Sequence, residues 1–176
     1  MDLSLLPIHH QAVIPESYLD EMGHMNVMWY THLFSSATDG LFNSVGLDLA
    51  YFEANQAGTF ALEQHVRFRV EVRAGQHVTI RSRVLGRSTK RFHFMQFMFN
   101  DDAGVLSATV ESIGTHVDLR IRRSSPLPAH VVEGFDRLIA EHSRLPWPAP
   151  VCGVMRPYSR WVSSFFLDMN AAPPYV

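Results

Sequence analysis

The chain has 176 residues, a formal net charge of −2, and 18% charged against 47% hydrophobic residues. This length favours a single domain, and the composition excludes a disordered polypeptide. The near-neutral charge gives no general attraction to nucleic acid or to anionic lipid. No apolar run approaches the roughly 18 residues of a membrane helix, and the start lacks the basic region of a signal peptide. We therefore expect a soluble, cytoplasmic protein with no nucleic-acid and no membrane partner.

The first predicted elements are an irregular strand, a polar turn and a long helix. Residues 9–20 mix strand-like residues with a proline, which is typical of an edge strand at best. Residues 20–26 form a polar turn with a central glycine. From Val27, apolar residues recur every three or four positions along one helical face, and Gly46 is a suitable stop. Asn26 can cap this helix, because its side-chain oxygen can accept a free N–H of the first turn.

Alternating strands follow the helix. The period changes to two, and strands are expected at residues 60–73, 77–86, 91–100 and 105–120. The strand at 91–100 is apolar on both faces, as in strands that are covered on both sides. One helix covers only one face of the sheet, so the other face requires another partner, most simply a second copy of the chain. The pattern predicts an α+β fold, with an antiparallel sheet wrapped around one long central helix, and a homodimer or dimer of dimers.

The composition changes after Arg123. A shorter amphipathic stripe over residues 131–139 predicts a second helix, and the tail from Pro146 carries six of the ten prolines. We expect residues 1–123 to form the main domain. Residues 124–176 would form a C-terminal helix and a proline-rich tail that packs on the same domain, although the tail could also dock on a partner subunit.

The densest polar cluster is Asp20, His24 and Asn26, directly before the helix. A helix N-terminus has free N–H groups and a partial positive charge, so it can hold a developing oxyanion. A carboxylate and an imidazole beside it can supply a general base and an orienting group. This combination suits attack on a carbonyl carbon. The structural alternative is that the cluster only caps the helix and forms its turn.

A resemblance favours the catalytic interpretation. Residues 20–27 read Asp-Glu-Met-Gly-His-Met-Asn-Val, and Tyr30 follows three residues later. This stretch resembles the signature of the hotdog-fold acyl-CoA thioesterases, which in the 4-hydroxybenzoyl-CoA thioesterase-like superfamily reads Asp-x-x-Gly-His-(Val/Met)-Asn followed by Tyr. The similarity extends over roughly residues 10–123. It implies a hotdog fold and hydrolysis of an acyl-CoA substrate to free acid and CoA, with no cofactor apart from the CoA of the substrate.

The resemblance also implies roles for single residues. Asp20 would be the catalytic carboxylate, as nucleophile or as general base for water. His24 would be catalytic beside it, and Asn26 would orient substrate or water. The backbone N–H of Val27 would bind the thioester oxygen, and Tyr30 belongs to the same substrate-binding motif.

Glu63 lies near the position of a second carboxylate that some branches of the family use, so it is a third candidate catalytic residue. It also falls on the charged face of its predicted strand, where it could simply pair with an arginine. Met22 stands where two related groups have an asparagine. The resemblance therefore does not carry their asparagine-assisted mechanism to this chain.

Basic residues cluster at the turn between the strands at 77–86 and 91–100, and Arg87, Lys90 and Arg91 are the candidates to bind the phosphates of CoA. The alternative is an ordinary solvated hairpin. The ten histidines include no helix-spaced pair with a carboxylate, and Cys152 is the single cysteine, so we expect no metal site.

Two other functions compete with hydrolysis on this fold. One is a non-catalytic acyl-CoA-binding protein, which has no chemical reason to keep Asp20 beside a thioester. The other is a hotdog hydratase or dehydratase, which places its histidine and acid differently.

Overall fold

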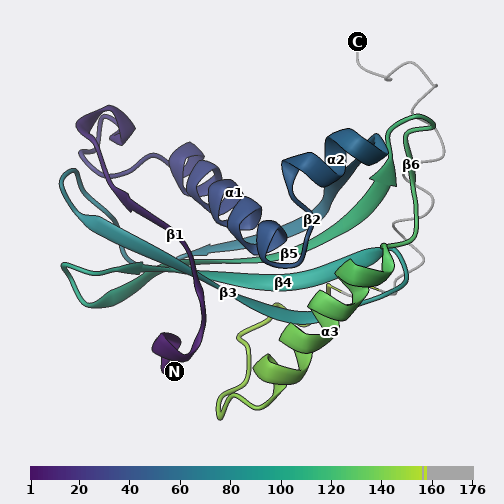
Figure 1. Cartoon of the computed structure of the whole chain (residues 1–176). Coiled ribbons are helices and arrows are strands. Elements are labelled where there is room, and N and C mark those ends of the chain that lie inside the picture. The colour runs from purple at the N-terminus through teal and green to yellow at the C-terminus, as the bar shows by residue number, and fades with distance from the viewer. Residues whose placement is uncertain (156, 158–176) are drawn as a thin grey trace.

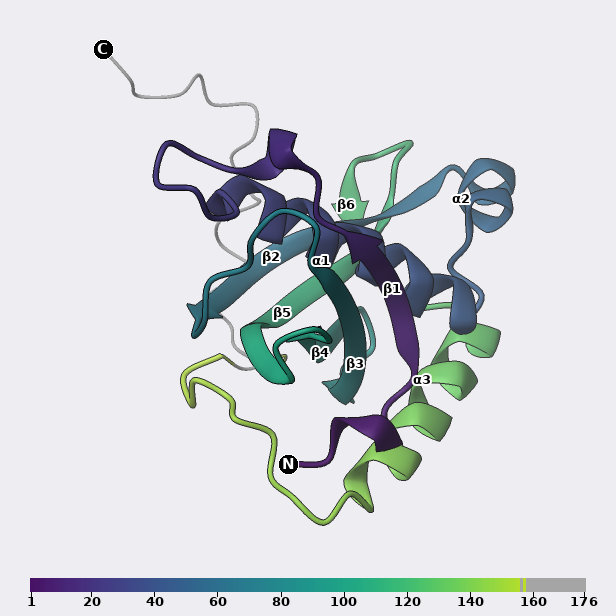
Figure 2. The same cartoon turned by 90° about the vertical axis from the view of Figure 1, so that its left-hand side faces the viewer.

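The computed structural model describes residues 1–155 and Pro157. One long helix lies in the concave face of a curled antiparallel sheet, as Figures 1 and 2 show. In chain order the elements are β1 (Ile8–Val13), α1 (Val27–Ser44), α2 (Leu49–Asn55), β2 (Ala57–Phe68), β3 (His77–Arg87), β4 (Arg91–Asn100), β5 (Val105–Asp118), β6 (Arg123–Ser124) and α3 (Ala129–Ser143). This confirms the predicted α+β architecture of a sheet wrapped around a central helix.

The sheet has the strand order β1-β3-β4-β5-β2, and the short strand β6 extends it by pairing with β5. All pairings are antiparallel. The first strand after the helix, β2, is therefore at one edge and β1 is at the other. The strand ends differ from the prediction by only one or two residues in β3 and β5, whereas β2 ends at Phe68 instead of continuing to residue 73.

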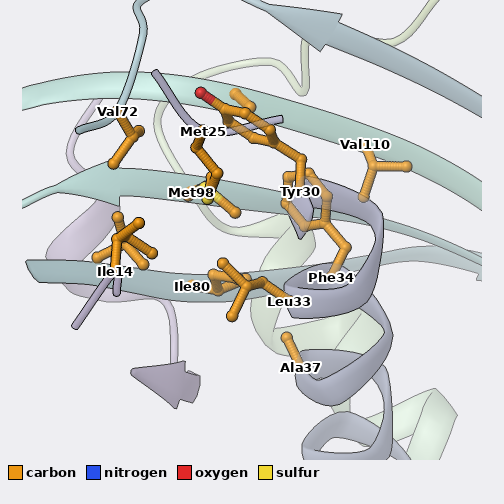
Figure 3. Close-up of a cluster of buried hydrophobic side chains, with 12 residues drawn as sticks. Ile14, Met25, Tyr30, Leu33, Phe34, Ala37, Val72, Ile80, Met98 and Val110 are labelled. Carbon is orange, nitrogen blue, oxygen red and sulfur yellow. The ribbon is translucent and has the colours of Figure 1, made fainter. Parts of the chain in front are cut away.

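Helix α1 begins and ends where the sequence predicted. The Asn26 side chain caps it by accepting a hydrogen bond from Met28 N–H at 3.0 Å. The apolar face of α1 packs on the sheet in the cluster of Figure 3, where Tyr30, Leu33, Phe34 and Ala37 meet residues of β3, β4 and β5. Each large apolar side chain buried in this way contributes about 1.5–3 kcal/mol, so this face holds the helix in the sheet.

Helix α3 confirms the second predicted helix. Its Phe135 ring stacks on Phe92 of β4, with ring centroids 5.7 Å apart, and the same cluster includes Leu41 and Val45 near the end of α1. Helix α2 was not predicted. Asp48 caps its seven residues by accepting Tyr51 N–H at 2.8 Å.

The outer face of the sheet is covered by the chain itself. Leu145, Trp147 and Ala149, in the segment that follows α3, pack over Met95 and Phe97 of β4. Figure 2 shows this yellow-green segment running along the outside of the sheet. We expected a second copy of the chain on this face. The structure instead places residues of the same chain there, so an uncovered outer face no longer argues for a dimer.

None of the helices in the described part of the chain is long and apolar enough to cross a membrane.

Candidate functional site

The polar turn stands at the N-terminus of α1 and is closed by its own backbone. Asp20 N–H donates to His24 O at 3.0 Å, and Gly23 N–H donates to Asp20 O at 3.0 Å. Gly23 has φ +79°, a left-handed conformation that costs other residues about 1–2 kcal/mol. Met25 N–H donates to Val72 O at 2.7 Å, and the Met25 side chain is buried in the core. The turn is therefore held in one conformation against the segment that follows β2.

Within this turn a carboxylate and an imidazole lie side by side. Asp20 Oδ1 accepts Met22 N–H at 2.9 Å, and Asp20 Oδ2 lies 3.5 Å from His24 Nδ1. The Asp20 and His24 side chains are 27% and 37% exposed. Among the described residues, backbone N–H groups engage only Oδ1 of Asp20, so Oδ2 beside His24 remains available to a water molecule or a substrate.

The first turn of α1 presents a free backbone donor next to this pair. Asn26 accepts from Met28 N–H, and its own N–H donates to Tyr18 O at 2.9 Å. Within the described residues, no hydrogen bond engages the N–H of Val27. The helix dipole adds partial positive charge at this point. The sequence-predicted group of Asp20, His24, Asn26 and Val27 is thus brought together in one place.

Tyr30 and Glu63 do not lie in this group within a single chain. Tyr30 is 4% exposed, and its ring packs edge-on against Phe68, with centroids 5.1 Å apart. Burial raises the pKa of Tyr30 above its ordinary value. Glu63 is exposed on β2, and because it lies four residues before Arg67, the two side chains are on the same face of the strand. Arg67 donates to Pro150 O on the outer side of the sheet, so Glu63 points away from the α1 side.

The three predicted CoA-binding cations lie around the β3–β4 turn, and each is engaged with another part of the chain. Arg87 makes two hydrogen bonds to the Asp136 carboxylate of α3, at 2.7 and 2.5 Å. Lys90 Nζ donates to Ser124 O at 3.1 Å, and Arg91 donates to Pro157 O at 3.3 Å. This turn lies beyond the C-terminal end of α1, so within one chain it is far from the polar turn.

A cavity of about 390 Å³ between α1 and β2, next to β4 and β5, was not predicted from the sequence. The sequence feature that could have indicated this cavity is a row of polar residues at helical spacing on α1, namely Thr31, Ser35, Thr38 and Asp39. Among the described residues, no group of three or more His, Cys, Asp or Glu side chains is arranged to hold a metal ion.

The site holds a carboxylate and an imidazole at a helix N-terminus, and this arrangement is chemically suited to attack on an activated carbonyl whose oxyanion the helix N-terminus can bind. The family model of the thioesterase-like superfamily matches residues 14–135. The chain belongs to this superfamily, as its motif predicted, and it is a thioester hydrolase.

Two curated relatives extend this finding. The chain is 33% identical to the betainyl-CoA thioesterase of Pseudomonas aeruginosa over 84% of this chain and 92% of that protein. It is also 33% identical to the L-carnitine dehydrogenase/betainyl-CoA thioesterase of Agrobacterium fabrum, over 75% of this chain but only 27% of that longer protein.

Solved structures agree on the hotdog fold. A Staphylococcus aureus protein in complex with CoA superimposes with a TM-score of 0.75 and 23% identity, over 81% of this chain and 90% of that one. The DHNA-CoA thioesterase of the same species gives a TM-score of 0.69 and 16% identity, over 74% of this chain and 89% of that one. At these identities the likeness shows the fold alone.

Proposed function

We propose that this protein hydrolyses acyl-CoA thioesters to the free acid and CoA at the polar turn before α1. The observation that carries the proposal is the free N–H of Val27 beside the Asp20–His24 pair. The carbonyl oxygen of the thioester binds at this N–H, where the helix N-terminus stabilises the negative charge that develops on it. One such donor contributes about 2.7–4 kcal/mol in the transition state.

Asp20 performs the attack in one of two ways. As a general base it takes a proton from water while the water oxygen bonds to the carbonyl carbon. The carbon–sulfur bond then breaks, and the thiolate of CoA leaves and gains a proton. As a nucleophile Asp20 bonds to the same carbon, CoA leaves, and water hydrolyses the resulting anhydride. His24, 3.5 Å away, orients the carboxylate or the water.

The relatives suggest the first substrate to assay. Two betainyl-CoA thioesterases are 33% identical to this chain, so we propose betainyl-CoA. Of the basic residues near the β3–β4 turn, exposed Lys90 is best placed to bind the phosphates of CoA, together with Arg91. Arg87 already holds Asp136, so its contribution to CoA binding requires that this pair opens. Glu63 stays a proposed catalytic residue, and Tyr30 a proposed substrate-binding residue.

A homodimer, or a dimer of dimers, is part of the proposal. Strand β2 is an edge strand of twelve residues, and within the described residues its outer edge has no partner strand. An exposed edge of this length is a template for pairing with a second copy. Static light scattering at micromolar concentration should report at least twice the 20.0 kDa of the chain. A monomer would remove this part of the proposal.

The decisive experiment is a panel of acyl-CoAs that includes betainyl-CoA and is read by the release of free thiol. Thiol release by the purified protein supports the proposal. Binding of acyl-CoA without thiol release would instead identify a non-catalytic binding protein. Interconversion of enoyl- and hydroxyacyl-CoA without thiol release would identify a hydratase or dehydratase. The cytoplasmic location expected from the sequence is a separate part of the proposal, and cell fractionation tests it.

A further inference from the structure

The cavity between α1 and β2 has the dimensions of a small-molecule site. Its volume of about 390 Å³ lies within the roughly 300–1,000 Å³ that is usual for ligand pockets. One wall is a single face of α1, and the opposite wall includes Thr59, Ala61 and Gln64 of β2. Gln64 is fixed there by a hydrogen bond from its amide to Ser112 Oγ at 3.3 Å. The roles proposed for the polar turn do not use this cavity.

The cavity is lined by aromatic rings and by one exposed carboxylate, that of Asp39, while the Arg122 guanidinium lies 5.7 Å from the ring of the lining residue Phe60. Phe42, Phe92 and Phe94 are buried and pack against one another, with ring centroids 4.9 Å apart for Phe42 and Phe92 and 6.1 Å for Phe42 and Phe94. Asp39 is the only ionisable side chain among the residues that line the cavity. Aromatic rings and a carboxylate both attract cations. A quaternary ammonium is weakly hydrated, so it loses little hydration free energy when it leaves water for such a site. A negatively charged ligand would be repelled by Asp39.

Contact of one acyl group with both Val27 N–H and Asp39 would need two copies of the chain. Asp39 follows Val27 by twelve positions of α1, which corresponds to about 18 Å along the helix axis. A short acyl group bound at Val27 N–H therefore cannot reach Asp39 of the same chain. However, β2 runs antiparallel to α1, since Phe68 contacts Tyr30 near the start of the helix while Thr59 lines the cavity with Phe42 near its end.

If two copies pair through their β2 edges about a twofold axis, the two β2 strands run antiparallel, so the end of β2 in one copy lies beside the start of β2 in the other. This pairing brings the start of α1 in one copy, with its polar turn, beside the cavity end of β2 in the other copy. In such a dimer the free Val27 N–H of one copy and the Asp39 carboxylate of the other would face a common space. In this arrangement a short acyl group can contact both.

We propose that this cavity binds the acyl group of the substrate and that Asp39 selects acyl groups that carry a positive charge. The inference rests on the proposed thioesterase function and on the dimer. It makes Asp39 a specificity-determining residue, contributed by the copy opposite to the one that supplies Asp20.

The test compares two acyl-CoAs of the same shape. Betainyl-CoA carries a trimethylammonium group, and 3,3-dimethylbutyryl-CoA carries a neutral tert-butyl group in its place. The ratio of their kcat/KM values should fall about tenfold or more in Asp39→Asn, which corresponds to about 1.4 kcal/mol or more, mainly through KM for betainyl-CoA. Glu133→Gln, which neutralises an exposed carboxylate on α3, is the matched control and should leave the ratio unchanged. An unchanged ratio in Asp39→Asn would overturn the proposal.

Failure of the thioesterase function itself gives a different result. In that case the wild-type protein releases thiol from no acyl-CoA, and calorimetry decides the role of Asp39 instead. Binding of betainyl-CoA at least tenfold more tightly to the wild type than to Asp39→Asn supports the proposal. Equal affinities overturn it.

Mixing variants tests whether the site is shared between copies. A mixed dimer of Asp20→Asn and Asp39→Asn chains contains one site with both carboxylates only if the two residues come from opposite copies. After subunit exchange the mixture should then be clearly more selective for betainyl-CoA than Asp39→Asn alone, because its mixed dimers contain intact sites beside the remaining Asp39→Asn homodimers. Subunit exchange is verified first. If the selectivity is then no better than that of Asp39→Asn alone, both residues act within one chain, and the proposal of a shared site is overturned.

Discussion

Replacement of Asp20 by asparagine should separate catalysis from stability. Asparagine has the same size and keeps a side-chain oxygen to accept Met22 N–H, the 2.9 Å hydrogen bond of the native turn. What is lost is the 3.5 Å contact of the carboxylate with the His24 imidazole, which is an ion pair only when the imidazole is protonated; because both side chains are partly exposed, this contact contributes about 1 kcal/mol or less. The free energy of unfolding should therefore change by no more than this amount, and the melting temperature should be nearly unchanged.

The expected effect on turnover is much larger. A positioned general base contributes about 10²–10⁴-fold to the rate, so kcat should fall by at least the lower of these factors, which is about 2.7 kcal/mol. Because an amide neither accepts a proton at neutral pH nor attacks a thioester, both versions of the mechanism predict this loss. Asp20→Ala should lose activity to the same extent.

Thiol release and urea unfolding measure the two quantities on the same preparation. Asp48→Asn is the matched control, because Asp48 accepts Tyr51 N–H at 2.8 Å in a similar contact at the start of α2, away from the polar turn. It should show a comparable small change in stability and wild-type kcat. Retention of most of the kcat in Asp20→Asn would refute the role of the carboxylate, and a large loss of stability would refute the separation of the two effects.

Three further predictions concern pH and packing. The kcat/KM should fall on the acid side in a single limb that is absent in Asp20→Asn. His24→Ala distinguishes the two candidate bases: substantial activity with an unmoved limb would assign the limb to Asp20, and loss of the limb would assign the base to the imidazole. Gly40→Ala should lower the free energy of unfolding by about 1–3 kcal/mol, because the new Cβ would lie 2.5 Å from His9 O. This loss should outweigh the preference of alanine for helices, which is about 1 kcal/mol. A variant that is more stable in urea unfolding would contradict this close approach of α1 and β1. Burial lowers the pKa of His9 from 6.5 to about 4, so the unfolded chain binds the proton first and stability should fall as the pH drops from 6.5 towards 4. Urea unfolding at pH 7 and pH 5 should show this loss of stability in the wild type and a smaller loss in His9→Gln. Equal stability of the wild type at the two pH values would contradict the prediction.

Local chemistry determined the parts of this protein that the sequence predicted correctly. The span of α1 follows from apolar residues at helical spacing, with Asn26 capping one end and Gly46 beyond the other. The strands follow from alternation, and the turn at Asp20 follows from a contiguous polar motif around Gly23. All these signals act between residues a few positions apart, where backbone geometry and capping decide the outcome.

Contacts between distant residues decided the rest. The apolar outer face of β4 required a cover, but only the folded chain shows that Trp147 and its neighbours supply it instead of a second copy. Arg87 was available as a phosphate-binding residue until the fold placed Asp136, 49 residues later, against it. Asp39 is one more exposed polar residue on a helix in the sequence, and only the packing of α1 beside β2 and β4 makes it part of the wall of a cavity. A hydrophobic or charge pattern specifies that a side chain needs a partner, and only the packing of elements far apart in the chain selects which partner it meets.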